Sequence, residues 1–129
     1  MLSALSAKIQ SAYSEGVSIG EAENLAGEFL HAMITLSEEL RQTDLNARMR
    51  KTGVKAVKAA VYLAQVQAVD KKPSDTLLGA RVDMDALVIK EQEALDTAEV
   101  DRDELERSYN ICREAHLHFR GLAKGRYEG

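Results

Sequence analysis

The chain has 129 residues, of which 45% are hydrophobic and 29% charged, and its formal net charge is −4. Its length is that of one domain, and its composition is that of a folded protein rather than a disordered one. The negative net charge argues against a protein that binds nucleic acid over its whole surface.

Cysteine usage and the first residues predict a cytoplasmic protein. Cys112 is the single cysteine, so an internal disulfide is excluded. The first ten residues, MLSALSAKIQ, contain neither a basic leader nor a long apolar run. No stretch approaches the roughly 20 apolar residues that span a bilayer, so no membrane partner is expected.

The first predicted element is a short N-terminal helix with a glycine-containing turn, over residues 1–18. Beyond it, apolar residues recur at alternating steps of three and four, the heptad spacing of a helix that packs along one seam. The pattern predicts a long helix over 19–70, with a possible kink near 43–53, where the seam weakens and Gly53 disfavours helix by about 1 kcal/mol. This first seam consists of Ile19, Ala22, Ala26, Phe29, Met33, Leu36, Leu40, Thr43, Ala47, Arg50, Val54, Val57, Val61, Ala64 and Ala68.

A connector over residues 71–83 is predicted to end the long helix. Pro73 cannot continue a helix, and Ser74 is suited to the N-cap of a short helix after it. A second long helix is predicted over 84–124, followed by a tail over 125–129. Its seam consists of Met84, Val88, Glu91, Leu95, Ala98, Arg102, Leu105, Tyr109, Cys112, His116, Phe119 and Ala123.

Two seams joined by a short connector predict an all-α protein, a long antiparallel helical hairpin with a short connecting helix in a single domain over 1–129. No segment has the period-two alternation of strands. Apolar residues outside the seams would stay exposed to water in an isolated hairpin. We therefore expect a homo-oligomer, in which copies of the chain associate through the heptad-like seams and these residues. They include Leu25, Leu30, Ile34, Leu45, Leu63, Leu78, Leu87 and Ile111.

The motifs of known chemistry are missing from the sequence. It has no glycine-rich phosphate loop, no HExxH and no CxxC. His116 and His118 are two residues apart, which places them on different sides of a helix, and Cys112 has the seam position of a small buried hydrophobe. We therefore expect no enzyme, no cofactor and no metal site.

Charges are segregated along the chain. Between Arg41 and Lys58 there are six basic residues and one acid, whereas Asp83 to Glu106 holds ten acids and two basic residues. A basic stripe on one side of a helix can follow phosphates. The alternative is that it pairs with the acidic face of the other helix or of a neighbouring subunit. Tyr62 is the only aromatic residue nearby, which weakens the prediction of single-strand binding.

The order of these segments resembles a family of small phage proteins grouped with the recombination mediator UvsY. The resemblance rests on KAVKAAVYLAQVQ, KKPSD, ARVDMDALV, LDTAEVDRDEL and NICREAHLHFRGLAKG, and covers about residues 20–125. It implies an all-helical, ring-forming protein that binds single-stranded DNA and helps to load a RecA-like recombinase in place of single-strand binding protein. By position, the implied DNA contacts are Arg48, Arg50, Lys51, Lys55 and Lys58.

The sequence thus leads to two alternative functions. The first is a non-enzymatic, oligomeric phage-type accessory protein of DNA recombination or replication, which binds single-stranded DNA, a recombinase or both. The second is a helical protein-interaction module, such as a phage scaffold, a packaging accessory or an inhibitor of a host protein, which acts through its acidic face.

Overall fold

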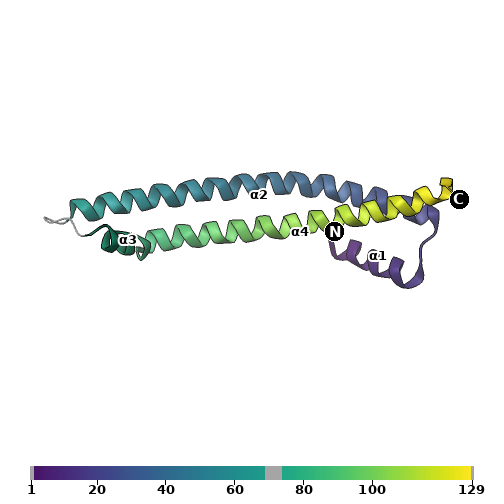
Figure 1. Ribbon diagram of the computed structural model, residues 1–129, viewed down its shortest axis with the longest axis horizontal. Helices are drawn as coiled ribbons and strands as arrows, with labels where there is room; N and C mark the ends of the chain where they lie inside the picture. Colours follow the sequence, from purple (N-terminus) through teal and green to yellow (C-terminus); the bar gives the residue numbers. More distant parts are fainter. Residues whose placement is uncertain (1, 69–73, 129) are drawn as a thin grey trace. The chain divides into compact units, whose positions relative to one another are not determined.

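The computed structural model describes residues 2–68 and 74–128, and these residues form four helices and no strand. Helix α1 spans Leu2–Glu15, α2 spans Ile19–Gln67, α3 spans Asp75–Asp83 and α4 spans Ala86–Glu128. Figure 1 shows α2 and α4 running antiparallel, with α3 between them in the chain. The predicted all-α hairpin with a short connecting helix is confirmed.

The turn between α1 and α2 depends on a glycine and a serine. Gly16 has a φ of 78°, in the left-handed region that favours glycine, and its N–H donates to the Ala12 carbonyl at 3.0 Å. Ser18 then caps α2, because its hydroxyl accepts a hydrogen bond from the Glu21 N–H at 3.2 Å. These two hydrogen bonds satisfy one backbone carbonyl at the end of α1 and one backbone N–H at the start of α2.

Helix α2 is continuous over 49 residues and passes through 43–53 without a break. Ala47 and Val54 are both buried on either side of Gly53. Their burial offsets the weak helix propensity of this stretch, because packing of one face contributes more to helical stability than propensity does. The possible kink near 43–53 therefore does not break α2.

Helix α3 begins as predicted at a serine cap. The Ser74 hydroxyl accepts a hydrogen bond from the Leu77 N–H at 3.2 Å. Pro73, together with the preceding lysine pair of the connector, lies outside the described residues. Met84 forms the C-cap of α3 and is 78% exposed, so its assignment to the second seam is wrong. It precedes Asp85, whose carboxylate accepts from the Leu87 N–H at 2.9 Å at the start of α4.

Helix α4 extends further than the sequence predicted. It ends at Glu128, whereas we expected a tail over 125–129. Gly121 and Gly125 keep negative φ values, since Gly16 is the one glycine with positive φ among the described residues. Neither glycine adopts the left-handed conformation that closes a helix, so both are accommodated at about 1 kcal/mol each.

The contacts within the chain form two units, and each is described by itself. Unit 1 consists of Met1–Leu40 and Glu104–Gly129, and unit 2 consists of Arg41–Asp103. Unit 1 therefore holds α1, the first part of α2 and the last part of α4. Unit 2 holds the rest of α2, all of α3 and the first part of α4. The expectation of a single domain stays a prediction.

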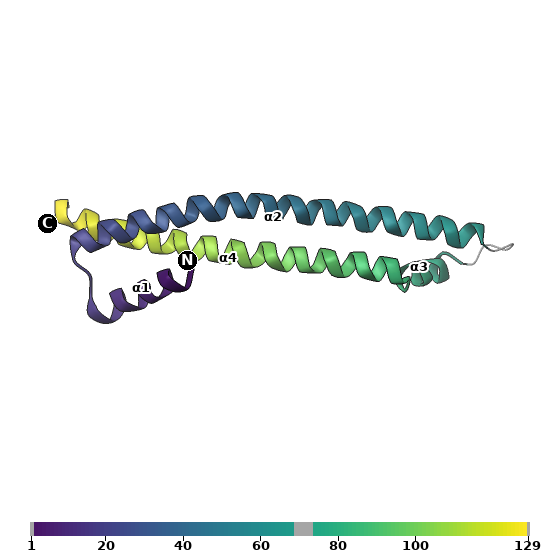
Figure 2. The same ribbon diagram turned by 180° about the vertical axis from the view of Figure 1, so that it is seen from behind.

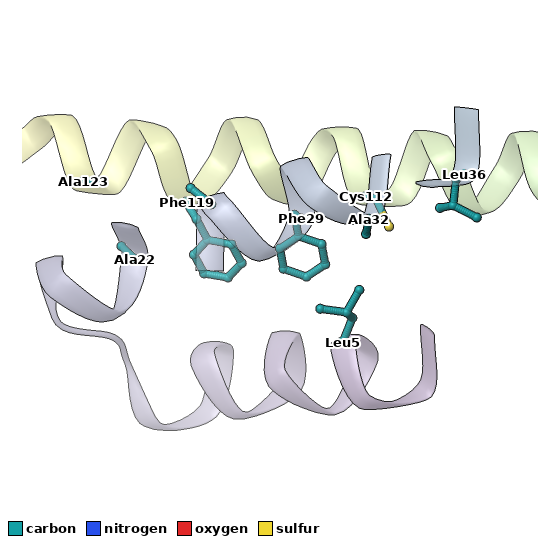
Figure 3. Close-up of a cluster of buried hydrophobic side chains, with 9 residues drawn as sticks. Leu5, Ala22, Phe29, Ala32, Leu36, Cys112, Phe119 and Ala123 are labelled. Atoms are coloured by element: carbon teal, nitrogen blue, oxygen red, sulfur yellow. The ribbon is translucent and has the colours of Figure 1, made fainter. Parts of the chain in front are cut away.

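The core of unit 1 is built around an aromatic pair. The rings of Phe29 on α2 and Phe119 on α4 are stacked, with centroids 5.9 Å apart and planes 8° apart. Figure 3 shows Leu5 of α1 pointing toward these rings. The other buried members are Ala22, Ala26, Ala32, Leu36, Cys112 and Ala123.

The core of unit 2 is built from smaller side chains. Val61 of α2, Val82 of α3 and Val88 of α4 form a buried cluster, with Tyr62 packed against it. Leu78 of α3 is fully buried. Figure 2, the view from behind, shows α3 next to the start of α4. Leu78 is thus covered within the chain itself, unlike most apolar residues off the seams.

The two predicted seams agree closely with the observed burial. In α4 every predicted seam residue except Met84 is buried or half-buried. In the first seam the exposed exceptions are Ile19, Arg50 and Ala64 on α2, and Ala68 directly after it. The exposure of Arg50 corrects its seam assignment, because an always-charged guanidinium without a buried partner stays in water.

Candidate nucleic-acid interface

Five basic residues form one continuous line on α2, in unit 2, which we call the basic stripe. Successive members are seven, three, four and three residues apart, so they lie on one side of a helix with 3.6 residues per turn. At 1.5 Å per residue the line is about 25 Å long. The basic stripe consists of Arg41, Arg48, Lys51, Lys55 and Lys58.

Four of the five residues predicted to contact DNA belong to this stripe, and Arg50 does not. Arg50 and Lys51 are neighbours in sequence, so their side chains leave the helix about 100° apart. Arg50 lies on the other side of the buried line through Ala47 and Val54. It is exposed, but it does not extend the row of cations.

Most of the stripe is open to solvent. Arg41, Lys51 and Lys55 are exposed and make no ion pair with any residue that the structure describes. Arg48 pairs with Asp44 on its own helix, with 3.1 Å between Nε and Oδ2. Lys58 pairs with Asp83 at the end of α3, with 3.5 Å between Nζ and Oδ1.

Of the acidic residues in unit 2 that the structure describes, only Asp44 and Asp83 pair with the stripe. Asp44 is the one acid in line with it, and the Arg102 guanidinium of α4 approaches that carboxylate at 3.9 Å while also pairing with Asp103. Across the described ranges, none of the carboxylates on the first part of α4 forms an ion pair with a stripe residue. Asp96 instead accepts a hydrogen bond from Gln92 at 3.0 Å.

Tyr62 continues the stripe at its C-terminal end. It follows Lys58 by four residues and Lys55 by seven, which is the same spacing that relates the cations to one another. It is half-buried and packs against the valine cluster of unit 2. The spacing of Tyr62 from the lysines is visible in the sequence, although aromatic residues are scarce in this region.

A shallow groove lies beside this end of the stripe. It has a volume of about 280 Å³ and is contained in unit 2. Its lining combines a cation and carboxylates with apolar side chains, namely Lys58, Asp83, Val88, Ile89, Gln92 and Glu93. The Lys58–Asp83 ion pair therefore lies at the margin of the groove, next to the valine cluster.

The groups that could support other chemistry are in structural positions. Cys112 is buried in unit 1, and desolvation raises the pKa of its thiol, which disfavours the reactive thiolate. His116 makes a 2.8 Å hydrogen bond from Nδ1 to the Ala26 carbonyl and so ties α4 to α2. Within residues 2–68 and 74–128, no three His, Cys, Asp or Glu side chains are grouped to hold a metal ion.

A second basic group lies on α4 in unit 1. Arg113, Arg120 and Lys124 are exposed and make no ion pair within the described part of the chain. Beside Arg113 is an open groove of about 480 Å³, lined also by Asn110, Glu114 and Leu117. These three cations are fewer and more widely spaced than those of the basic stripe.

Searches for similar proteins returned nothing for this chain: no model of a known protein family, no curated protein and no solved structure matches it. Among the helices in the described ranges, none combines the length and apolar character needed to cross a membrane.

Proposed function

We propose that this protein is a non-enzymatic, cytoplasmic accessory protein that binds single-stranded DNA through the basic stripe on α2. The observation that carries the proposal is the exposure of Arg41, Lys51 and Lys55 without an ion-pair partner among the described residues. A row of free cations on one helix is what a phosphate backbone requires, because each contact releases condensed counterions. The resemblance to the UvsY group supports the same proposal and implies a role in recombination.

The acidic net charge is compatible with this function because the charges are separated. The basic stripe occupies one line of α2, and within the described residues it pairs only with the carboxylates of Asp44 and Asp83. At physiological ionic strength, charges more than about 8 Å apart in solvent are largely screened from one another. A phosphate on the stripe therefore interacts more strongly with the nearby cations than with the net negative charge of the whole chain.

Self-association is part of the proposal. Several large apolar side chains on the outer side of α2 are exposed, with Leu45 at 59%, Met49 at 67% and Leu63 at 57%. Covering them in a homo-oligomer would repeat the basic stripe, and linked sites bind one long polyanion far more tightly than a single site does. Light scattering tests this directly, and a monomer mass at micromolar concentration would remove it from the proposal.

The test of DNA binding uses a fluorescent single-stranded oligonucleotide at about 50 mM salt, where phosphate contacts are strongest. The variant is Lys51→Glu/Lys55→Glu. The control is Arg81→Glu/Lys90→Glu, which makes the same charge change at two exposed positions of unit 2 outside the stripe. We expect the first variant to abolish binding with unchanged helicity, and the second to retain most of it.

The salt dependence sharpens this test. For single strands the slope of log K against log salt is about −0.7 per phosphate contact, so replacing Lys51 and Lys55 by alanine reduces it by about 1.4. Equal losses in both double Glu variants would mean that net charge, not the stripe, determines binding. Absence of binding by the wild-type protein at about 50 mM salt would refute the proposal.

A protein-interaction role is the second candidate. The carboxylates Glu93, Asp96 and Asp101 on α4 are exposed and none of them pairs with the stripe in the described structure. They could bind a basic surface on a RecA-like recombinase or on single-strand binding protein. This candidate would be favoured if the wild-type protein binds either purified partner and does not bind DNA, and if Glu93→Lys/Asp96→Lys loses the partner.

A further inference from the structure

We infer that Tyr62 stacks on an unpaired base at the C-terminal end of the basic stripe and so gives the protein a preference for single strands over duplex. The inference rests on the proposed function, because it names a further contact with the same ligand. It assigns a role to a residue that phosphate binding alone does not use.

The position of Tyr62 is the first argument. It lies one turn beyond Lys58 and two turns beyond Lys55, on the same side of α2. A strand whose phosphates contact these two lysines reaches Tyr62 within about 10 Å of helix length. Tyr62 is also the only aromatic residue between positions 41 and 103, so unit 2 has one aromatic ring and it lies in line with the cations.

The support beneath the ring is the second argument. Tyr62 packs against the cluster of Val61, Val82 and Val88, which comes from three helices, and it remains partly exposed. A ring held in this way has already lost much of its rotational freedom, so stacking a base on it costs less entropy. Its hydroxyl makes no hydrogen bond to any part of the chain that the structure describes.

The chemistry of stacking is the third argument. Contacts to phosphates do not select single strands, because a duplex presents phosphates too, at a higher charge density. An aromatic ring can stack on a base only when that base is not already stacked in a duplex, and it accepts any of the four bases. The expected ligand is therefore a single strand of any sequence, with the stripe on its phosphates and Tyr62 on one base.

The experiment compares a deoxythymidine oligonucleotide with an abasic chain of the same length, which keeps the phosphates and removes every base. Three proteins are measured: wild type, Tyr62→Leu, which keeps an apolar side chain on the valine cluster, and Tyr62→Phe, which keeps the ring. We expect wild type to bind the oligonucleotide about tenfold more tightly than the abasic chain. Tyr62→Leu should lose that ratio without a change in abasic binding, and Tyr62→Phe should retain it.

The outcomes separate this inference from the proposed function. Absence of binding to either chain refutes the proposed function and this inference with it. Binding of wild type and Tyr62→Leu with the same preference for bases refutes stacking by Tyr62 and leaves the stripe intact. If Tyr62→Leu loses binding to both the oligonucleotide and the abasic chain and also loses helicity, the substitution disturbs the fold. A spectroscopic test then decides whether Tyr62 stacks on a base.

That test uses the absence of tryptophan in the chain. With Tyr13, Tyr109 and Tyr127 changed to phenylalanine, Tyr62 is the only tyrosine that emits. Stacking should quench its fluorescence when the thymidine oligonucleotide binds, and the abasic chain should leave it unchanged. Equal emission with both chains at saturation would refute stacking without relying on a substitution at position 62.

Discussion

The two units of this protein use the same pair of helices for different purposes. In unit 1, α2 and α4 bury a stacked phenylalanine pair and are joined by Leu5 of α1. In unit 2 the buried side chains are mostly valine and alanine, and the surface of α2 carries the basic stripe. Large apolar side chains and surface charge are therefore distributed unequally along one heptad pattern.

The physical consequence concerns local stability. Aromatic side chains bury the largest apolar area per residue, and burial stabilises by about 25 cal/mol per Å². Unit 1 should therefore open less often than unit 2, since local opening is easiest where few apolar contacts are lost. Hydrogen exchange measured on peptides from each unit would show slower exchange in unit 1, and the reverse order would contradict this interpretation.

The largest expected effect comes from removing an aromatic core side chain. Phe29→Ala should lower the free energy of unfolding by about 3–5 kcal/mol, because it removes half of the stacked pair and leaves a cavity. Val61→Ala, at the matching position in the cluster of unit 2, removes two methyl groups and should cost about 2 kcal/mol. Urea denaturation followed by circular dichroism measures both, and equal losses would show that the two cores are equivalent.

The same contrast explains how much of the fold could be predicted. The heptad spacing identified the buried faces of both helices because apolar residues must repeat every three or four positions to stay on one side. Met84 was misassigned because it fits the spacing but is the C-cap of α3, directly before Asp85, which caps the start of α4. The end of α4 was missed because glycine is permitted, but not required, to end a helix.

The candidate site could be predicted only in part. Charge spacing alone predicted that most of Arg41, Arg48, Lys51, Lys55 and Lys58 lie on one side of a helix, which the geometry of α2 reproduces. Periodicity could not show that Lys58 pairs with Asp83, because that pair depends on how α3 meets α2. The partly exposed ring of Tyr62 likewise depends on the valine cluster beneath it.

A pair of glycine substitutions tests the backbone in each unit. Gly16→Ala in unit 1 should destabilise the protein by about 1–2 kcal/mol, because a side chain is strained at a φ of 78°. Gly53→Ala in unit 2 should stabilise it by about 1 kcal/mol, since the added Cβ meets only Glu91 Oε2 at 3.6 Å. Thermal unfolding of both variants checks the opposite signs, and a destabilised Gly53→Ala would mean that the helices are closer there.

The two serine caps provide a matched comparison of smaller size. Ser18 and Ser74 each accept a backbone N–H at 3.2 Å, one at the start of α2 in unit 1 and the other at the start of α3 in unit 2. Each Ser→Ala change should cost about 1 kcal/mol. Because α3 has only nine residues, exchange protection after Ser74→Ala should fall throughout that helix, whereas Ser18→Ala should affect only the first turn of α2.

The smallest effect is expected from the ion pair that joins α2 to α4 in unit 2. Arg102 Nη1 lies 3.9 Å from Asp44 Oδ1, and both side chains are about one-third exposed, at 31% and 36%. A double-mutant cycle with Asp44→Asn and Arg102→Gln should therefore give a coupling energy of about 0.2–1 kcal/mol, and less at high salt.

The single change Asp44→Asn has a second consequence, because it also releases Arg48 from its 3.1 Å pair. It should strengthen single-stranded DNA binding at about 50 mM salt, since the one acid in line with the basic stripe is removed. Unchanged DNA affinity in this variant would indicate that the phosphates follow a different face of unit 2.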